Sequence, residues 1–136
     1  MAALREVTRS VDPAIRRHAL AEPPPGRFEG RIADQSRSLV VEAVHEAFQL
    51  HYGEPRAFGE MDADLRLLAG DSLYALAVDR LSARGDLEAI RELADLISLS
   101  ARAVAEGRRE LVGQLWEASV EALGGGRSAG AAALGT

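Results

Sequence analysis

Apolar residues recur every three or four positions along most of this chain, which is the spacing of an amphipathic helix. The clearest case lies between residues 33 and 52, where two adjoining rows of apolar side chains make a wide stripe: Leu39, Ala43, Ala47 and Leu50, beside Val40, Val44 and Phe48. The pattern predicts a helix over 33–52. Gly53 would end it in the left-handed conformation, and Pro55 confirms the stop.

The same period predicts further helices downstream. Residues 62–84 carry leucines on more than one face, which predicts a central helix contacted on several sides. Gly85 fits the residue that closes this helix, and Asp86 fits the N-cap of the next. So short a turn makes the two helices antiparallel neighbours. The later pattern starts at residue 87, bends or splits at Gly107 and continues to residue 123.

The N-terminal region has a different pattern. Residues 2–20 predict one broken helix or two short ones, interrupted at Asp12-Pro13, and three consecutive prolines then stop any helix. The expected organisation is an all-α bundle of four to five helices. It would comprise an N-terminal helical segment (1–21), a Pro-rich linker (22–30), a helical bundle (31–123) and a flexible tail (124–136).

Composition supports helices and narrows the function. Ala and Leu supply 43 of 136 residues, against 15 for Val, Ile and Thr, which favours helix over strand. The net charge of −5 argues against general nucleic-acid binding. There is no Cys, so no thiol chemistry is available. The sequence shows neither a membrane-spanning apolar run nor a secretory signal, so we expect a cytoplasmic protein.

Two residues interrupt the pattern of the 62–84 helix. Gly70 lies inside a helix at a cost of about 1 kcal/mol relative to Ala, which makes sense where another helix crosses closely. Asp71 has Leu67 and Tyr74 among its neighbours one turn away, so we expect a buried carboxylate with a partner. We interpret Gly70, Asp71, Tyr74 and Leu67 as structural or interface residues. A tuned acid or a metal ligand is the alternative for Asp71.

Metal chemistry has weaker candidates. Glu42 and His45 form one Glu-x-x-His pair, but a di-iron bundle needs two such pairs, and only a symmetric dimer could supply the second. Asp62 and Asp64, next to Glu60, could bind a divalent cation. Acidic residues at a helix start are also stabilising by themselves, and we favour that interpretation. We expect no cofactor held by this chain alone.

A family resemblance emerges from the stretch Phe58-Gly59-Glu60 … Leu67-Leu68-Ala69-Gly70-Asp71-Ser72-Leu73-Tyr74-Ala75-Leu76-Ala77. Together with the following segment from residue 93 to 107, it resembles the trans-prenyl (polyprenyl) diphosphate synthases over about residues 57–115. The resemblance implies an isoprenoid-synthase-like partial bundle. It also implies that the Gly-Asp helix and the helix after it pack near a subunit interface.

The departures from that family bear on activity. Its enzymes hold Mg²⁺ on a diphosphate with two Asp-Asp-x-x-Asp motifs, whereas this sequence contains no Asp-Asp pair. No catalytic residue is carried over. The resemblance therefore implies a non-catalytic subunit, as a homodimer or with a larger prenyl synthase chain, where prenyl transfer and Mg²⁺ belong to the partner. A stand-alone helical dimerisation module and a dimeric carboxylate/His metalloenzyme remain the alternatives.

Overall fold

The computed structural model describes residues 3–125 and confirms the all-α class, with no strand among those residues. Four helices make the body of the fold, and two short ones precede them. Their bounds are α1 Ala3–Arg9, α2 Pro13–Arg16, α3 Gln35–Tyr52, α4 Ala63–Arg84, α5 Leu87–Ala105 and α6 Val112–Leu123, with a 3₁₀ turn η1 at Arg109–Leu111. No helix in this region of the chain is long and apolar enough to cross a membrane.

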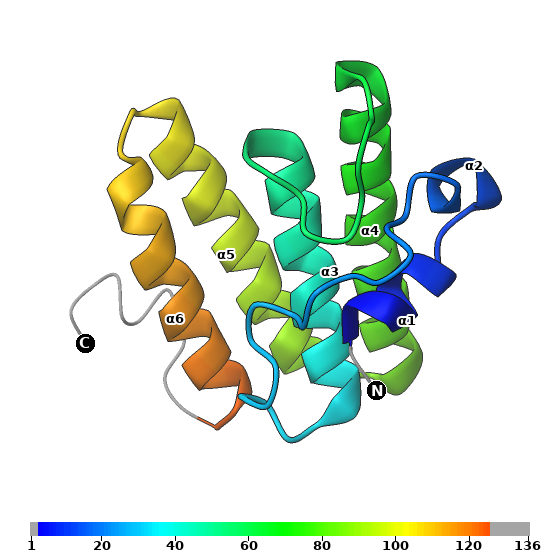
Figure 1. Cartoon of the computed structure of the whole chain (residues 1–136). Coiled ribbons are helices and arrows are strands. Elements are labelled where there is room, and N and C mark those ends of the chain that lie inside the picture. Colours follow the sequence, from blue (N-terminus) through cyan, green and yellow to red (C-terminus); the bar gives the residue numbers. More distant parts are fainter. Residues whose placement is uncertain (1–2, 126–136) are drawn as a thin grey trace.

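Helix α3 is the central element (Figure 1). Every residue from Val40 to Phe48 is buried, because α1, α4 and α5 pack around it. The prediction that the 62–84 helix would be central is therefore wrong. Helix α4 has a row of exposed residues along its outer side, including Leu67 and Leu68, so its leucines on several faces do not mean burial on several faces.

Helices α4 and α5 meet at Gly85, as predicted. They separate from there with α3 between them in Figure 1, so they do not pack side by side along their length as expected of antiparallel neighbours. Gly85 has a φ of 69°, the left-handed conformation expected of it. Asp86 caps α5 by accepting a hydrogen bond from the Ala89 amide. The N-cap predicted at Asp12 is confirmed in the same way, since its carboxylate accepts from the Ala14 amide.

The end of α3 differs from its prediction. Gly53 has φ −147° and ψ −135°, so the left-handed turn expected there is absent. Arg66 of α4 ends the helix instead. Its guanidinium donates to the carbonyls of Leu50 (3.0 Å), Gln49 (3.1 Å) and Gly53. A cation at the carbonyl end of a helix is favourable, so this contact both closes α3 and fastens α4 to it.

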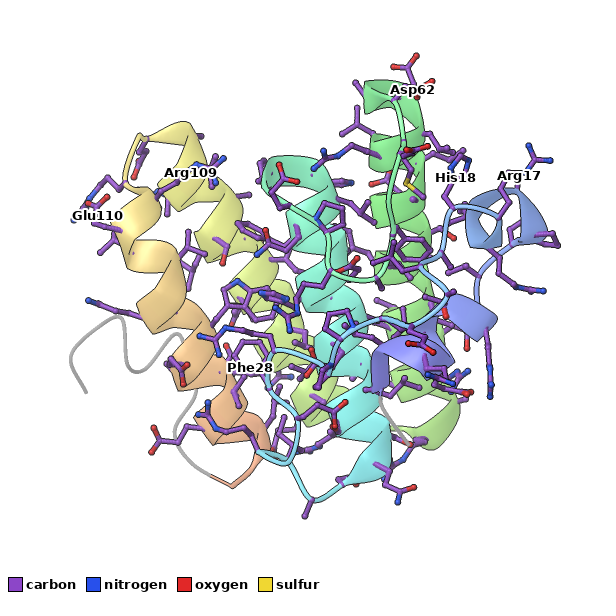
Figure 2. All side chains as sticks on the ribbon, viewed as in Figure 1. Arg17, His18, Phe28, Asp62, Arg109 and Glu110 are labelled. Carbon is purple, nitrogen blue, oxygen red and sulfur yellow. The ribbon has the colours of Figure 1, made fainter. Side chains whose placement is uncertain are left out.

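The segment predicted to be a linker, 22–30, contains no helix but packs into the fold. Phe28 is 3% exposed and points inward between α3 and α6, where its ring stacks on Trp116 (Figure 2). Trp116 of α6 is itself buried. This segment therefore contributes Phe28 to the core. Most of the tail predicted to be flexible, from residue 126 onward, lies outside the described residues.

Candidate functional site

The predicted helix crossing at Gly70 is confirmed. A Cβ atom at Gly70 would lie 2.3 Å from the His51 ring and 3.2 Å from the Ala47 carbonyl oxygen, both on α3. Real side chains do not approach this closely, so only a glycine lets α4 lie against α3 at this point. His51 completes the crossing, because its Nε2 lies 3.1 Å from the Leu67 carbonyl oxygen.

The expectation that Asp71 is buried is wrong. Its side chain is 71% exposed, and it pairs with His51, whose Nε2 lies 3.3 Å from the Asp71 Oδ1. The error has a simple cause: Leu67 and Ala75, one turn away on either side, are exposed too. Apolar neighbours one turn away show which residues share a face, but not whether that face is covered.

Tyr74 lies at the border between the covered and the open side of α4. It is half-buried, and its ring meets the His51 ring edge to face at 5.4 Å. Burial raises the pKa of the Tyr74 hydroxyl above its ordinary value, so this group stays protonated and neutral. It acts in packing and is not a candidate base.

The outer side of α4 forms a continuous surface that we name the α4 outer face. Its members share one side of the helix and are exposed: Leu67, Leu68, Asp71, Ala75 and Val78. Only five large apolar side chains of the described chain are exposed, and three of them, Leu67 (51%), Leu68 (61%) and Val78 (51%), lie here. A fourth, Leu87, begins α5. Single exposed apolar residues are ordinary, but several on one helix face mark an interaction surface.

Glu42, a metal candidate in the sequence, holds a loop in the structure. It is 1% exposed, and its carboxylate accepts hydrogen bonds from the amides of Arg27 (2.9 Å) and Phe28 (2.8 Å). Gly26 makes this approach possible, because a Cβ there would lie 2.4 Å from the Glu42 Cδ. Burial raises the pKa of Glu42, and the two amide donors oppose that shift.

Glu46 has the same structural role, one helical turn further along α3. It is fully buried, and its carboxylate accepts from the amides of Arg56 (2.8 Å) and Ala57 (2.7 Å). Burial raises the pKa of Glu46 as well. Glu46 was not among the residues predicted from the sequence. The sequence did contain a signal for it. Glu42 and Glu46 are four residues apart in a helix whose other positions here are almost all apolar. Both carboxylates would therefore be buried on the same face and require hydrogen-bond partners.

His45 lies among aromatic rings and not in a ligand set. Its ring meets Phe28 at 5.3 Å and Trp116 at 5.0 Å, both edge to face, and its Nε2 lies 3.3 Å from the Gln49 amide nitrogen. Burial lowers the pKa of His45 to about 4, so the ring is neutral near pH 7. The positive charges of Arg27 and Arg56 contribute to this shift.

The remaining metal candidates, Asp62 and Asp64, lie at the start of α4, whereas Glu42 and His45 lie on α3. Asp62 caps α4 by accepting from the Leu65 amide at 2.8 Å, and Asp64 is exposed in the first turn of that helix. The preferred helix-start interpretation is thus confirmed for Asp62. Among the residues from 3 to 125, no group of three or more His, Asp or Glu side chains is placed to hold a metal ion. The structure does not bring the four candidates together.

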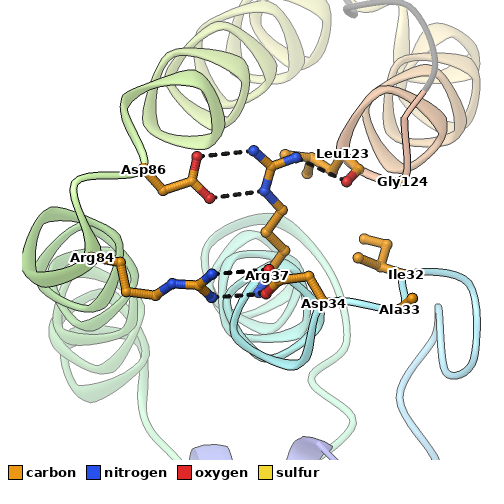
Figure 3. A pocket seen from close by; sticks show the side chains of 8 residues that line it. All are labelled: Ile32, Ala33, Asp34, Arg37, Arg84, Asp86, Leu123 and Gly124. Carbon is orange, nitrogen blue, oxygen red and sulfur yellow. Dashed lines mark hydrogen bonds and ion pairs between the residues drawn. The ribbon is translucent and has the colours of Figure 1, made fainter.

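A hollow of about 410 Å³ lies where α3, α4, α5 and α6 bring their ends together (Figure 3). Arg37 binds Asp86 through two hydrogen bonds of 2.8 and 2.9 Å, and Arg84 binds Asp34 through two of 2.8 and 2.9 Å. Arg37 also donates to the Leu123 carbonyl at 3.0 Å. We name these four charged residues the Arg–Asp clamp.

The Arg–Asp clamp is built for holding helices together. Each carboxylate serves twice, since Asp34 also caps α3 and Asp86 also caps α5. The hydrogen bonds from Arg84 and Arg37 keep the pKa values of Asp34 and Asp86 below their ordinary range. Both guanidinium groups are therefore already neutralised, which leaves little attraction for an anionic ligand in the hollow.

Comparison with known proteins adds no relative: no family model, no curated protein and no solved structure matches this chain.

Proposed function

We propose that this protein is a non-catalytic helical subunit that binds a larger, catalytic prenyl-diphosphate-synthase-like chain through the α4 outer face. The observation that carries the proposal is the concentration of exposed apolar side chains on that face, at Leu67, Leu68 and Val78. The choice of partner rests on the resemblance of the Gly70-Asp71 helix to the corresponding helix of that family.

The geometry of α4 suits a docking surface. Leu68 and Val78 are ten residues apart, so the apolar side chains extend over about 15 Å of helix. Ala75 between them is small and exposed, which lets a partner helix approach closely. The crossing of Gly70 with His51 and the capping of α3 by Arg66 fix α4 firmly to the body of the fold. A rigid face of this kind loses little freedom on binding.

Charge on the same face defines the partner further. Asp71 and Asp79 are exposed beside the apolar residues, and the Asp71 carboxylate keeps most of its surface open although it pairs with His51. A complementary helix would carry apolar residues over Leu68 and Val78 and a basic residue opposite Asp71. This pattern commits the proposal to a helical protein partner.

The structural use of the acidic side chains supports a non-catalytic role. The sequence has no Asp-Asp pair to hold Mg²⁺ on a diphosphate. The buried acids of α3, Glu42 and Glu46, are occupied by loop amides. Within a complex, the chemistry and the metal would belong to the partner, and this subunit would shape the partner's pocket and so affect product length.

The test mixes this protein with a catalytic trans-prenyl diphosphate synthase from the same source and measures elongation of an allylic diphosphate. We expect a complex and a changed product length or rate. A synthase whose products and rate stay the same, and which forms no complex, contradicts the proposal. A complex of two identical chains through the same face would instead define a helical dimerisation module, and the native mass of the protein alone distinguishes the two.

A further inference from the structure

A second surface, separate from the α4 outer face, carries an excess of positive charge. Helices α1 and α2 and the residue that follows them expose four arginines, which we name the α1–α2 edge: Arg5, Arg9, Arg16 and Arg17. Residues 3–20 contain these four arginines and only two acidic residues, Glu6 and Asp12, although the whole chain has a net charge of −5. The net charge of residues 3–20 is thus opposite in sign to that of the whole chain.

These arginines differ from five others in the fold, which are paired with carboxylates. Arg27, Arg31, Arg37, Arg84 and Arg102 each lie in an ion pair with a carboxylate. In the described chain no ion pair includes an arginine of the α1–α2 edge. Two acids of this region accept backbone hydrogen bonds, since Asp12 caps α2 and Glu29 accepts from the Ala3 amide. The positive charge of the edge can therefore attract an external anion.

The α1–α2 edge is a folded platform and not a loose basic tail. Leu4, Val7, Val11 and Ile15 anchor it, each 4% exposed or less. Arg80 of α4 donates to the Ser10 hydroxyl at 3.1 Å, which fastens the turn between the two helices. Arg17 and His18 project from the outer margin of the molecule in Figure 2. The exposed Leu20 follows them at 43% exposure.

We propose that the α1–α2 edge adsorbs this protein to the surface of a membrane that contains anionic phospholipids. Guanidinium groups bind phosphate oxygens through paired hydrogen bonds, and Leu20 provides an apolar contact at the headgroup level. Charges more than about 8 Å from the lipid are largely screened at physiological ionic strength, so the acidic remainder of the protein does not cancel the attraction.

Other anionic partners fit this edge less well. A polynucleotide site commonly makes about 6–10 phosphate contacts, more than four arginines supply. A stable protein interface has an apolar centre, which the α4 outer face offers and the α1–α2 edge does not. Each arginine near an anionic membrane surface strengthens binding by roughly 5-fold. Four arginines therefore suit reversible adsorption to such a surface.

The test is cosedimentation of the full chain with vesicles of phosphatidylcholine, with and without phosphatidylglycerol, at low and high salt. The variant Arg9→Gln/Arg17→Gln removes two exposed arginines of the edge. Arg91→Gln/Arg108→Gln makes the same charge change at exposed positions on α5 and after it. The melting temperatures of both variants serve as the control for folding.

We expect binding to the anionic vesicles alone, weakened by salt. The Arg9/Arg17 variant should bind roughly 30-fold more weakly, and the Arg91/Arg108 variant as the wild type. Three results overturn the proposal: no adsorption to anionic vesicles, equal losses in both variants, or equal binding to neutral vesicles. Retention on immobilised polyglutamate through Arg9 and Arg17, without vesicle binding, also overturns it and assigns the edge to an acidic protein.

Discussion

Polar side chains inside α3 are each matched to a specific partner. Glu42 and Glu46 accept loop amides, and His45 lies between aromatic rings with its charge suppressed. Burying such groups is costly unless they are paired, so these contacts also fix where the loops at 26–28 and 56–57 lie on the helix. The same residue-level matching explains the glycines at 26 and 70, where a side chain would displace the partner group.

Gly70→Ala should destabilise the protein although alanine favours helix. Contact with the His51 ring costs about 1–3 kcal/mol, which outweighs the roughly 1 kcal/mol gained in helix propensity. In a His51→Ala background the ring is gone, so the same substitution should cost at least about 1 kcal/mol less. Urea unfolding of the four proteins measures this, and an identical cost in both backgrounds contradicts the contact between Gly70 and the His51 ring.

His45 should make stability depend on pH. Its pKa falls from 6.5 in the unfolded chain to about 4 in the folded one, so only the unfolded state takes up a proton between these values. The wild type should therefore lose about 2 kcal/mol more than His45→Gln when the pH falls from 7 to 5. Denaturant unfolding at both pH values measures the difference.

Comparing the wild type with His45→Gln isolates the contribution of His45 to the pH dependence of stability. Burial raises the pKa values of Glu42 and Glu46, so these acids act with the opposite sign: the stability that they confer is greatest at low pH and declines as pH rises through their raised pKa values. Both proteins contain the two acids, so their contribution cancels. Parallel pH profiles would mean that His45 is protonated equally in the folded and unfolded states, contrary to its burial.

Residue-level prediction from the sequence succeeded for some positions and failed for others. Gly70 stood out because a glycine inside a helix is costly, and the close approach of His51 explains that cost. Asp71 failed because periodicity assigns a face to a residue and leaves open whether another element covers that face. His51 could not be chosen as its partner, since that pairing depends on how α3 and α4 cross.

At the scale of elements, the ends of helices hold the bundle together. The Arg–Asp clamp joins the start of α3, the end of α4 and the start of α5, and Arg37 reaches the end of α6 (Figure 3). Of the ends in this clamp, Gly85 and Asp86 were predicted from local capping signals, as was the cap at Asp12 on α2. The cap at Asp34 on α3 was not predicted. The packing of residues 22–30 was not predictable, because an irregular segment with one buried Phe28 has no period.

The two functions of Asp86 can be separated by substitution. Asp86→Ala should lose the cap on α5, worth about 1 kcal/mol, and also leave the partly buried Arg37 without its main partner, at about 1–3 kcal/mol more. Asp86→Asn keeps a good N-cap and should recover about 1 kcal/mol of that loss. Urea unfolding compares the two variants. Full stability in both would show that the clamp does not hold the helices.

On the scale of the whole molecule, the fold covers the middle of α3 completely and leaves one long side of α4 open. Sequence reasoning reversed these positions, because both helices are rich in apolar residues and the choice of centre depends on how all the helices assemble. It did predict that the open helix is an interface element, through the resemblance around Gly70 and Asp71. That role stays a prediction, and the exposed Leu67, Leu68 and Val78 give it a physical basis.

Substitution on the α4 outer face should therefore leave folding intact. Leu68 and Val78 are more than half exposed, so Leu68→Glu/Val78→Glu removes little buried surface and should melt at nearly the wild-type temperature. Ala94→Glu/Ala105→Glu is the matched control, with two carboxylates added at exposed positions of α5. A large fall in melting temperature for the first variant alone would mean that this face belongs to the core of the chain.

The most direct measurement is sedimentation velocity of this protein with a catalytic prenyl synthase chain from the same source. The account predicts one faster boundary that contains both chains for the wild type and for the Ala94/Ala105 control. It predicts two separate boundaries for the Leu68/Val78 variant. Separate boundaries for the wild type, or a complex that the Leu68/Val78 variant preserves, would contradict the assignment of α4 as the partner-binding surface.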